Sequence, residues 1–440
     1  MRLSAPTGDT PWRAPSSYWP ALTSAIAGRP LPCATLDATA VEHNASDLVH
    51  RAAGLPIRVA TKSVRSRPVL QAVLQLPGFA GVLAYTLAEA VWASTWCADV
   101  VLGYPTADRA ALSDLLADER ACRHVTLMID SIDHLDLIDS VAAPGVRPEV
   151  RVAIELDLAY DPPRAGRITG RIGVYRSPIS TVTAARALAR AVVGRAGFAL
   201  VGAMGYEAQL AGIGDALLTA ESWPGRLANT ATSARTLILR RLQSDSWFDV
   251  LARRAAMVAA ISDITGGLEF VNGGGTGSIH LTRQDPSVTE VAAGSGLFGP
   301  TLFDGYRAFT PAPAAAFALP VVRRPSAEIA TVLGGGWIAS GPPGPSRVPR
   351  PVWPQQMRMI ANEGAGEVQT PLRGPGASDL RVGDLTWWRH AKAGELCEHI
   401  DELVVVRTTG RAGAQAGPGD VTAEVVDTIP TYRGEGKAFL

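Results

Sequence analysis

The sequence predicts an eight-stranded parallel barrel of the (β/α)8 or TIM-barrel class, followed by a smaller all-β domain. From residue 30 to about 300, short apolar runs alternate with amphipathic stretches, the pattern of parallel strands joined by helices. After about residue 310 the helical periodicity nearly vanishes, and Pro- and Gly-rich turns separate short strands. The 440 residues, 47% of them hydrophobic, suffice for two such domains.

Eight runs are predicted to be barrel strands because they are short, rich in β-branched residues and followed by glycine or polar residues. They cover residues 57–61, 81–85, 99–103, 124–130, 150–157, 198–204, 268–271 and 288–292. Between them, stretches such as 64–76 and 181–193 place apolar residues three and four apart, as amphipathic helices do. A (β/α)8 barrel closes with eight parallel strands that alternate with helices, and this is the number of strands predicted here.

The change in texture near residue 310 predicts the domain division. We expect an N-terminal extension at 1–29, the barrel at 30–309 and the β domain at 310–440. Pro311, Pro313 and Pro320 mark the linker, and residues 403–406 form one of the apolar runs beyond it.

Charge and cysteine content exclude several function classes. Lys plus Arg and Asp plus Glu are 41 each, so no bulk positive field favours nucleic acid. The four cysteines form no CxxC pair, which favours a reducing compartment over a disulfide framework or a zinc ribbon. The Pro- and Ser-rich N-terminus does not read as a signal peptide, and no apolar run of about 18 residues suggests a membrane span. We therefore expect a cytoplasmic protein without nucleic-acid or membrane partners.

Lysine is rare, and one lysine stands where barrel enzymes place catalytic groups. Only three of the 41 basic residues are lysines, namely Lys62, Lys392 and Lys437. Arginine replaces lysine at most surface positions, but it cannot lose its proton to become a nucleophile. Lys62 falls at the carboxyl end of the strand predicted at 57–61. Barrel enzymes place their catalytic groups at this end of the strands. Arg58, Arg65 and Arg67 are its neighbours in sequence, and positive charges nearby favour an amine nucleophile. A solvated lysine at a strand end is the alternative.

Two glycine-rich loops follow the last two predicted strands. Residues 272–278 read Asn-Gly-Gly-Gly-Thr-Gly-Ser, and residues 294–296 read Gly-Ser-Gly. Glycines let backbone N–H groups approach an anion, and loops after strands seven and eight are the usual phosphate site of a barrel. The sequence contains neither a Walker loop nor GxGxxG at these points. A phosphate site together with a strand-end lysine predicts pyridoxal 5'-phosphate (PLP) as the cofactor.

The sequence also resembles a known family. Its motifs are similar to those of the amino acid deaminase/aldolase family, alanine-racemase-like barrel enzymes related to D-threonine aldolase and D-serine dehydratase. The resemblance covers about residues 30–440, and its most distinctive segments are 57–65, 81–90, 103–106, 204–209, 273–278, 289–296, 389–395 and 432–437.

The resemblance implies roles for individual residues. Lys62 would carry the cofactor as an aldimine. The phosphate contacts would come from Gly274, Gly275, Thr276, Ser295 and Gly296.

Further cofactor contacts are implied beside these loops. Tyr206 and Gln209 fall where relatives have a Tyr-x-x-His segment, with Gln209 in the place of the histidine, which removes an acid–base group there. Arg171 and Arg176 flank the position of an arginine near the cofactor ring. The sequence does not decide between these two arginines, and Arg176 is the one we name among the expected cofactor residues.

The second domain departs from its relatives at a metal site. D-threonine aldolases and D-serine dehydratases bind a divalent metal through a histidine and an Asp or Cys two residues later. His390 matches the histidine, but Lys392 follows it, and a protonated lysine cannot be a ligand. Three interpretations stay open: Lys392 replaces the metal, Glu395 or Cys397 supplies a ligand, or the segment is structural. We expect no metal, with His390 and Glu395 as the candidate ligands if one binds.

The resemblance implies a PLP-dependent lyase that cleaves the Cα–Cβ bond of a D-3-hydroxy amino acid. Lys62, Tyr206, His390 and Lys392 are the candidate catalytic residues, with His390 as the base. The alternatives are a dehydratase or deaminase that yields a 2-oxo acid and ammonia, a racemase that uses Tyr432, and a non-catalytic PLP carrier. A homodimer is implied, in which the β domain of one chain covers the barrel mouth of the other and completes the site.

Overall fold

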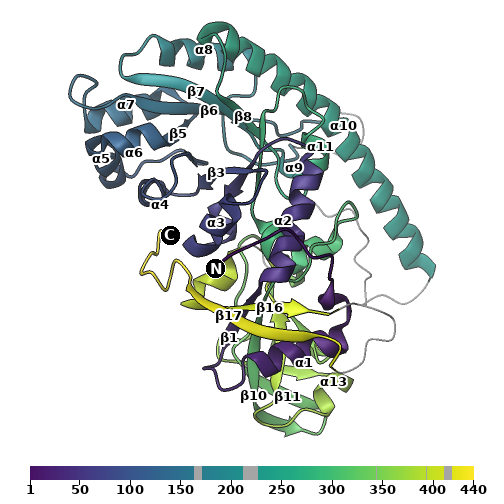
Figure 1. Cartoon of the computed structure of the whole chain (residues 1–440). Coiled ribbons are helices and arrows are strands. Elements are labelled where there is room, and N and C mark those ends of the chain that lie inside the picture. Colours follow the sequence, from purple (N-terminus) through teal and green to yellow (C-terminus); the bar gives the residue numbers. More distant parts are fainter. Residues whose placement is uncertain (163–170, 212–225, 343, 393, 411–418) are drawn as a thin grey trace.

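Eight parallel strands close into a barrel in a computed structural model of the chain, as the sequence predicts (Figure 1). The structure describes residues 1–162, 171–211, 226–342, 344–392, 394–410 and 419–440, and of 226–240 and 242 it describes the backbone only. The barrel strands are β2 (Ile57–Ala60), β3 (Phe79–Ala84), β4 (Val100–Leu102), β5 (Val125–Ile129), β6 (Val150–Leu156), β7 (Phe198–Gly205), β8 (Phe270–Gly273) and β9 (Glu290–Ala293). Each overlaps a predicted strand, in the same order.

Helices connect the barrel strands, and several begin at a side chain that caps their first turn. Thr86, Asp108 and Thr181 each accept a hydrogen bond from a backbone N–H of the helix that follows, which fixes where that helix starts. The helices are α2 (Ala38–Ala52), α3 (Arg67–Leu74), α4 (Leu87–Ala93), α5 (Arg109–Ala117), α6 (Glu119–His124), α7 (Ile132–Val141), α8 (Val182–Val193), α9 (Ala208–Ala211), α10 (Arg226–Thr265), α11 (Ile279–Thr282) and α12 (Ser295–Phe298), with the 3-10 turns η2 (Thr61–Ser63) and η3 (Thr301–Gly305).

A mostly antiparallel sheet forms the second domain (Figure 1). Its main order is β13-β14-β11-β10-β1-β16-β17, and β15 joins β10 to β12 at its side. The strands are β1 (Cys33–Asp37), β10 (Ala315–Ser326), β11 (Ile329–Leu333), β12 (Arg350–Trp353), β13 (Arg358–Met359), β14 (Gln369–Arg373), β15 (Leu385–Arg389), β16 (Glu402–Thr409) and β17 (Thr422–Pro430). The short helical elements are η1 (Pro11–Arg13), α1 (Pro15–Ala25), η4 (Pro345–Arg347), α13 (Pro375–Ser378) and α14 (Glu395–Glu398).

The start of the chain belongs to this second sheet, which differs from the predicted division at residues 29 and 30. β1 pairs antiparallel with β10 and parallel with β16, so it lies inside the sheet. Helix α1 packs on the same sheet through Trp19, whose ring centroid is 5.6 Å from that of Trp387. The barrel is therefore inserted between the first two strands of the β domain. Local sequence does not reveal this, because the partners of β1 begin at Ala315 and Glu402.

The β domain packs against the carboxyl end of β2. The backbone N–H of Tyr432 donates to the carbonyl of Arg65 (2.8 Å), and the Ser66 hydroxyl donates to the carbonyl of Pro430 (2.8 Å). The Tyr432 hydroxyl donates to the buried carboxylate of Glu89 on α4 (3.0 Å). These contacts hold the second domain beside the segment that carries Lys62.

Glu89 makes this domain contact sensitive to pH. Burial raises the pKa of Glu89 from 4.5 to about 7, although bonds from neighbours including Tyr432 act against the rise. A carboxyl whose pKa is raised in the folded state stabilises the fold when protonated, and that contribution is lost as the pH rises from about 4.5 through about 7. We expect Glu89→Gln to flatten the decline in the free energy of unfolding between about pH 5 and pH 8, by about 2 kcal/mol.

Urea unfolding of the wild type and Glu89→Gln at several pH values measures this difference. Each protein serves as its own reference across pH, so a constant loss of stability in the variant does not affect the comparison. Two parallel curves would show that Glu89 does not titrate as described.

Candidate active site

A cavity of about 330 Å³ lies between the barrel and the β domain, at the carboxyl ends of the barrel strands. Barrel enzymes place their chemistry at this end. The barrel side contributes Lys62, Tyr104, Arg176, Tyr206, Gly274, Gly275, Thr276 and Ser295, and the β domain contributes Ser340, Arg347, Lys392 and Glu395. The two domains of a single chain therefore line one site.

Lys62 reaches the cavity from the 3-10 turn η2, which directly follows β2. The preceding residue anchors this turn, because the Thr61 hydroxyl donates to the carbonyl of Leu83 on β3 (3.1 Å). The Lys62 ammonium donates to the hydroxyl of Tyr104 (2.8 Å).

Tyr104 is a site residue that the sequence analysis did not identify. Burial by itself would raise its pKa, but the nearby Lys62 and Arg176 outweigh burial and lower the pKa of Tyr104 below its ordinary value. The lysine and the phenol thus form a pair that can share a proton. The segment at 103–106 was distinctive in the sequence, but no local pattern indicates that its tyrosine faces Lys62.

The three arginines near Lys62 in sequence are all paired with carboxylates. Arg58 is paired with Glu290 and Asp99, Arg65 with Glu398, and Arg67 with Glu435. Each positive charge is compensated by a carboxylate from a distant part of the chain.

The two glycine-rich loops meet at the cavity, as their positions after β8 and β9 predict. The Thr276 side-chain oxygen accepts from the Ser295 hydroxyl (3.2 Å) and from the Gly296 N–H (3.2 Å), so it bridges the loops. A Cβ atom at Gly296 would approach the Thr276 methyl to 2.8 Å. The loops can therefore lie this close only with glycine there, and they form a cradle of backbone and hydroxyl groups.

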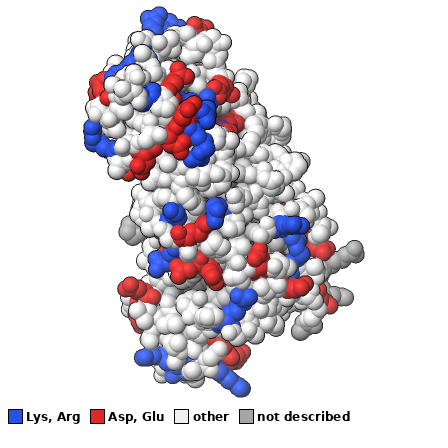
Figure 2. All heavy atoms as spheres, turned by 60° about the vertical axis from the view of Figure 1, so that its left-hand side comes forward, with Lys and Arg blue, Asp and Glu red and all other residues white. Residues whose placement is uncertain are grey.

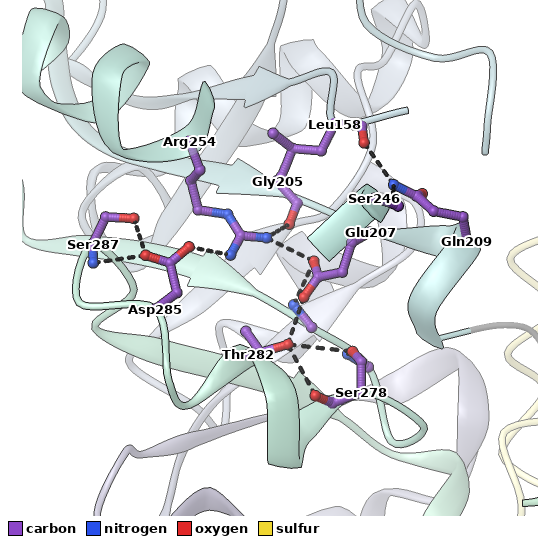
Figure 3. A network of polar contacts seen from close by, with 12 residues as sticks. Leu158, Gly205, Glu207, Gln209, Ser246, Arg254, Ser278, Thr282, Asp285 and Ser287 are labelled. Carbon is purple, nitrogen blue, oxygen red and sulfur yellow. Dashed lines mark hydrogen bonds and ion pairs between the residues drawn. The ribbon is translucent and has the colours of Figure 1, made fainter. Parts of the chain in front are cut away.

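A buried network of ion pairs and hydrogen bonds fixes the position of the first of these loops, residues 272–278 (Figure 3). The Gly274 N–H donates to the carboxylate of Glu207 (3.1 Å), which also accepts from the Thr282 hydroxyl (2.5 Å). Arg254 of α10 donates to Glu207 and to Asp285, each at 2.8 Å, and its side chain is fully buried. The Gly274 N–H is thus occupied within the protein. This bond fixes the position of Gly274, which lines the cavity, and its predicted phosphate contact stays a prediction.

Arg176, and not Arg171, reaches the cavity. Its guanidinium lies over the ring of Tyr104 at 5.3 Å and over that of Tyr206 at 5.1 Å. It is also 3.9 Å from the carboxylate of Glu155, a carboxyl whose pKa burial raises to about 7. Arg171 instead pairs with Asp157. Of the two arginines that the sequence left open, Arg176 lies at the cavity and Arg171 does not.

Tyr206 and Gln209, predicted together, lie in different environments. Tyr206 lines the cavity, and burial raises its pKa, while Arg176 partly opposes that rise. The Gln209 amide donates to the carbonyl of Leu158 (2.8 Å) and to the Ser246 hydroxyl (3.0 Å), and Gln209 does not line the cavity (Figure 3). We therefore remove Gln209 from the candidate cofactor residues.

The β-domain wall of the cavity carries Lys392. Its ammonium donates to the carbonyl of Ser340 (3.4 Å), and burial, with Arg347 and Lys62 nearby, lowers its pKa. Glu395 accepts a hydrogen bond from the Ser340 N–H (3.2 Å). Among the described residues, no group of three or more His, Cys, Asp and Glu side chains is arranged to hold a metal ion.

His390 does not reach the cavity, which contradicts its predicted role as the base. It is 1% exposed, and its ring stands edge-on to Phe298 with the centroids 6.4 Å apart. Burial, followed by the adjacent Arg389, lowers the pKa of His390 to about 3. Its backbone carbonyl accepts from the Thr301 N–H (3.0 Å), a contact between the domains. These features describe a neutral residue of the domain interface.

The chain's own β domain contributes residues to the wall of the cavity, and the expected contribution of a partner's β domain stays a prediction. One expectation about the second domain changes. Tyr432, the residue proposed for racemisation, is 1% exposed and bonded to Glu89, and it does not line the cavity.

Gly394 sets the distance between the β domain and Lys62. Its φ is +92°, and an added Cβ atom would collide with the carbonyl oxygen of Lys62. We expect Gly394→Ala to reduce the free energy of unfolding by about 2–4 kcal/mol, through backbone strain and separation of the two walls. Gly436→Ala is the matched control, because Gly436 has φ +67° and nothing within 4 Å of an added Cβ, so only about 1 kcal/mol is expected there. Equal losses in urea unfolding would rule out the contact with Lys62.

The distribution of charged side chains on the surface does not point to a particular class of binding partner. Acidic and basic side chains are interspersed over the face seen in Figure 2, and no continuous basic patch covers the described part of that face. Within the described ranges, no helix combines enough length with enough apolar sequence to cross a bilayer.

Comparison with known proteins identifies the fold. No protein-family model and no curated protein sequence matches the chain. Among solved structures, D-threonine aldolase from Filomicrobium marinum is similar with a TM-score of 0.69 and 18% identity, over 93% of this chain and 96% of that one.

Two further structures agree. D-threo-3-hydroxyaspartate dehydratase from Delftia sp. HT23 has a TM-score of 0.62 and 19% identity, over 92% of this chain and 98% of that one. An alanine-racemase-like protein from Idiomarina loihiensis has a TM-score of 0.61 and 16% identity, over 86% of this chain and 94% of that one. The chain therefore has the alanine-racemase-type fold, an eight-stranded parallel barrel followed by a mostly-β domain.

Proposed function

We propose that the protein is a PLP-dependent lyase that cleaves the Cα–Cβ bond of a D-3-hydroxy amino acid. One observation carries the proposal. Lys62, at the end of a barrel strand, faces the same cavity as the two glycine-rich loops. The similarity to D-threonine aldolase supports the reaction type and the D configuration.

The residues of the cavity fit PLP. Lys62 would bind the cofactor aldehyde, and Thr276, Ser295 and the backbone of their loops, which line the cavity, would hold its phosphate. Arg176 and Tyr206 lie beside the space for the ring. When bound, PLP withdraws electrons from the bonds at the substrate Cα and weakens them.

The chain's own residues then manage the protons. Lys392 faces the cavity with a lowered pKa, so a larger fraction is neutral and able to take the proton of the 3-hydroxyl. Loss of that proton lets the Cα–Cβ electron pair stay with Cα as the aldehyde leaves. Lys62 Nζ and Tyr104 Oη, 2.8 Å apart, are placed to return a proton to Cα, which gives glycine. In this scheme Lys392 replaces His390 as the base.

The other classes make different predictions for the same site. A PLP carrier needs no second domain on its cofactor, whereas Lys392 and Arg347 line this cavity from the β domain. A racemase requires a second base opposite Lys62, and Tyr432 does not provide it, since it is buried against Glu89. The dehydratase remains the closest alternative, because Lys392 could also protonate a departing hydroxyl. A homodimer remains a prediction, which sedimentation analysis would check.

Product analysis tests the proposal. The PLP-loaded protein is incubated with D-3-hydroxy amino acids, beginning with D-threonine, and Lys62→Arg serves as the blank. Glycine with an equal amount of aldehyde is the expected result. A 2-oxo acid with ammonia would replace the lyase by the dehydratase, and formation of the L isomer would indicate a racemase.

A further inference from the structure

A buried carboxyl group stands inside the barrel, close to the candidate active site. Glu155 is 3% exposed and lies near the carboxyl end of β6. Ala153, two residues earlier, packs in an apolar layer of the barrel interior, and residues two apart on a strand point to the same face. Glu155 therefore faces the interior beside this layer, whose other members are Val101, Met128, Val201, Met204 and Phe270.

The segment after β6 brings Arg176 back to this carboxyl group. The Ser177 hydroxyl donates to the backbone carbonyl of Glu155 (2.6 Å), and Arg176 Nη1 lies 3.9 Å from Glu155 Oε1. Among the described residues, Arg176 is the ion-pair partner of Glu155. The same guanidinium lies 5.3 Å from the ring centre of Tyr104, whose hydroxyl accepts from the Lys62 ammonium (2.8 Å). These four side chains therefore form a continuous series from the barrel interior to Lys62.

Charged groups from two neighbouring elements act on Glu155 in opposite directions. Burial raises its pKa to about 7, Arg176 opposes the rise, and Asp130, just after β5, adds to it. Asp130 Oδ1 is itself 3.4 Å from the ring of His134. On the other side, β7 places the uncharged Met204 opposite Glu155 in the sheet. The charge of Glu155 therefore changes near neutral pH, under the influence of one arginine and one aspartate.

This charge reaches the Lys62–Tyr104 pair. Burial and the ionised Glu155 raise the pKa of Tyr104, whereas Lys62 and Arg176 lower it. We infer that Glu155 is a positioning residue that, together with Arg176, sets how tightly the Lys62–Tyr104 pair holds its proton. The ionised carboxylate compensates Arg176 and favours the protonated pair. The neutral carboxyl group leaves the arginine charge uncompensated, which favours loss of the proton. The inference rests on the proposed function for its effect on turnover, but not for the reactivity of Lys62.

Chemical labelling of the lysines tests the inference without cofactor or turnover. Acetic anhydride reacts with the unprotonated amine, and the chain has only three lysines, so each labelled peptide is assigned by mass spectrometry. Lys437, outside the cavity, is the internal reference. Glu155→Gln should raise the labelling rate of Lys62 about 3- to 10-fold at about pH 8.5 and leave it unchanged at about pH 5.5. The midpoint of this rise should lie near pH 7, where Glu155 ionises in the wild type.

Three further variants identify the groups involved. Glu155→Asp keeps an ionisable carboxyl group and should retain the wild-type pH dependence. Asp157→Asn is the matched control, because Asp157 follows β6 two residues later and pairs with Arg171, outside the cavity. It should leave the labelling of Lys62 at the wild-type rate. In an Arg176→Gln background, the effect of Glu155→Gln should appear at higher pH, because Arg176 opposes the rise in the pKa of Glu155.

Three outcomes would overturn the inference. A ratio of labelling rates between Glu155→Gln and the wild type that does not change with pH would leave Glu155 a role in the fold alone. The same pH-dependent rise in Asp157→Asn would assign the effect to net charge rather than to Glu155. An unchanged midpoint in the Arg176→Gln background would remove the arginine from the interaction. The expected labelling without any lyase product would retain the inference and reject the proposed function.

Discussion

Lys62→Arg is expected to abolish both covalent binding of PLP and product formation. Arginine keeps the positive charge and can still donate to Tyr104, but it stays protonated and cannot act as an amine nucleophile. We expect turnover to fall by more than about 10³-fold, as it does when a residue that forms the covalent link is removed. The visible absorption band of lysine-bound PLP should disappear as well.

Lys437→Arg is the matched control, because Lys437 lies near the end of the chain, against Trp92 and outside the cavity. Borohydride reduction followed by peptide mass spectrometry locates the cofactor without any knowledge of the substrate. A label on the wild-type peptide that contains residue 62, and none in the variant, is the expected result. A label on another lysine would contradict the site assignment, whatever the reaction.

Arg254→Met is expected to cause the second large effect. Arg254 compensates two carboxylates, Glu207 and Asp285, and the side chains of all three are fully buried. Removing the arginine leaves buried negative charge without a partner, which typically costs about 3–5 kcal/mol of unfolding free energy. Arg241→Met is the control on the same helix, where an exposed pair with Asp245 predicts a loss below about 0.5 kcal/mol.

The same network should influence the cofactor, because Glu207 holds the Gly274 N–H. Glu207→Gln keeps an oxygen acceptor but removes the charge that attracts Arg254. We expect it to weaken PLP binding about 10-fold or more while the protein stays folded, as an absorbance titration would measure. Unchanged PLP affinity in a folded Glu207→Gln variant would mean that the network serves stability alone.

The barrel could be predicted because its signals are local. Each parallel strand is a short apolar run followed by glycine or a polar residue, and the glycines of both loops lie where their lack of a side chain is required. Lys62 was noticeable because lysine is rare in this chain.

The interior of the site could not be predicted in the same way, because its contacts join distant residues. Tyr104 lies 42 positions from Lys62, and the carboxylate that compensates Arg65 lies 333 positions away at Glu398. His390 matched a motif in sequence, yet burial at the domain interface keeps it from the cavity. Arg347 lies in a Pro- and Gly-rich segment without periodicity, so nothing local indicated that it lines the cavity.

The position of β1 has a consequence for synthesis of the protein. This strand leaves the ribosome long before its neighbours, which begin at Ala315 and Glu402. At about 5–20 residues per second, β1 waits for roughly 15 seconds to a minute before β10 is made. The residues of the inserted barrel are synthesised during this interval, while the five residues of β1 remain without pairing partners. A strand this short offers few backbone groups to neighbouring nascent chains, which limits misassembly on crowded polysomes.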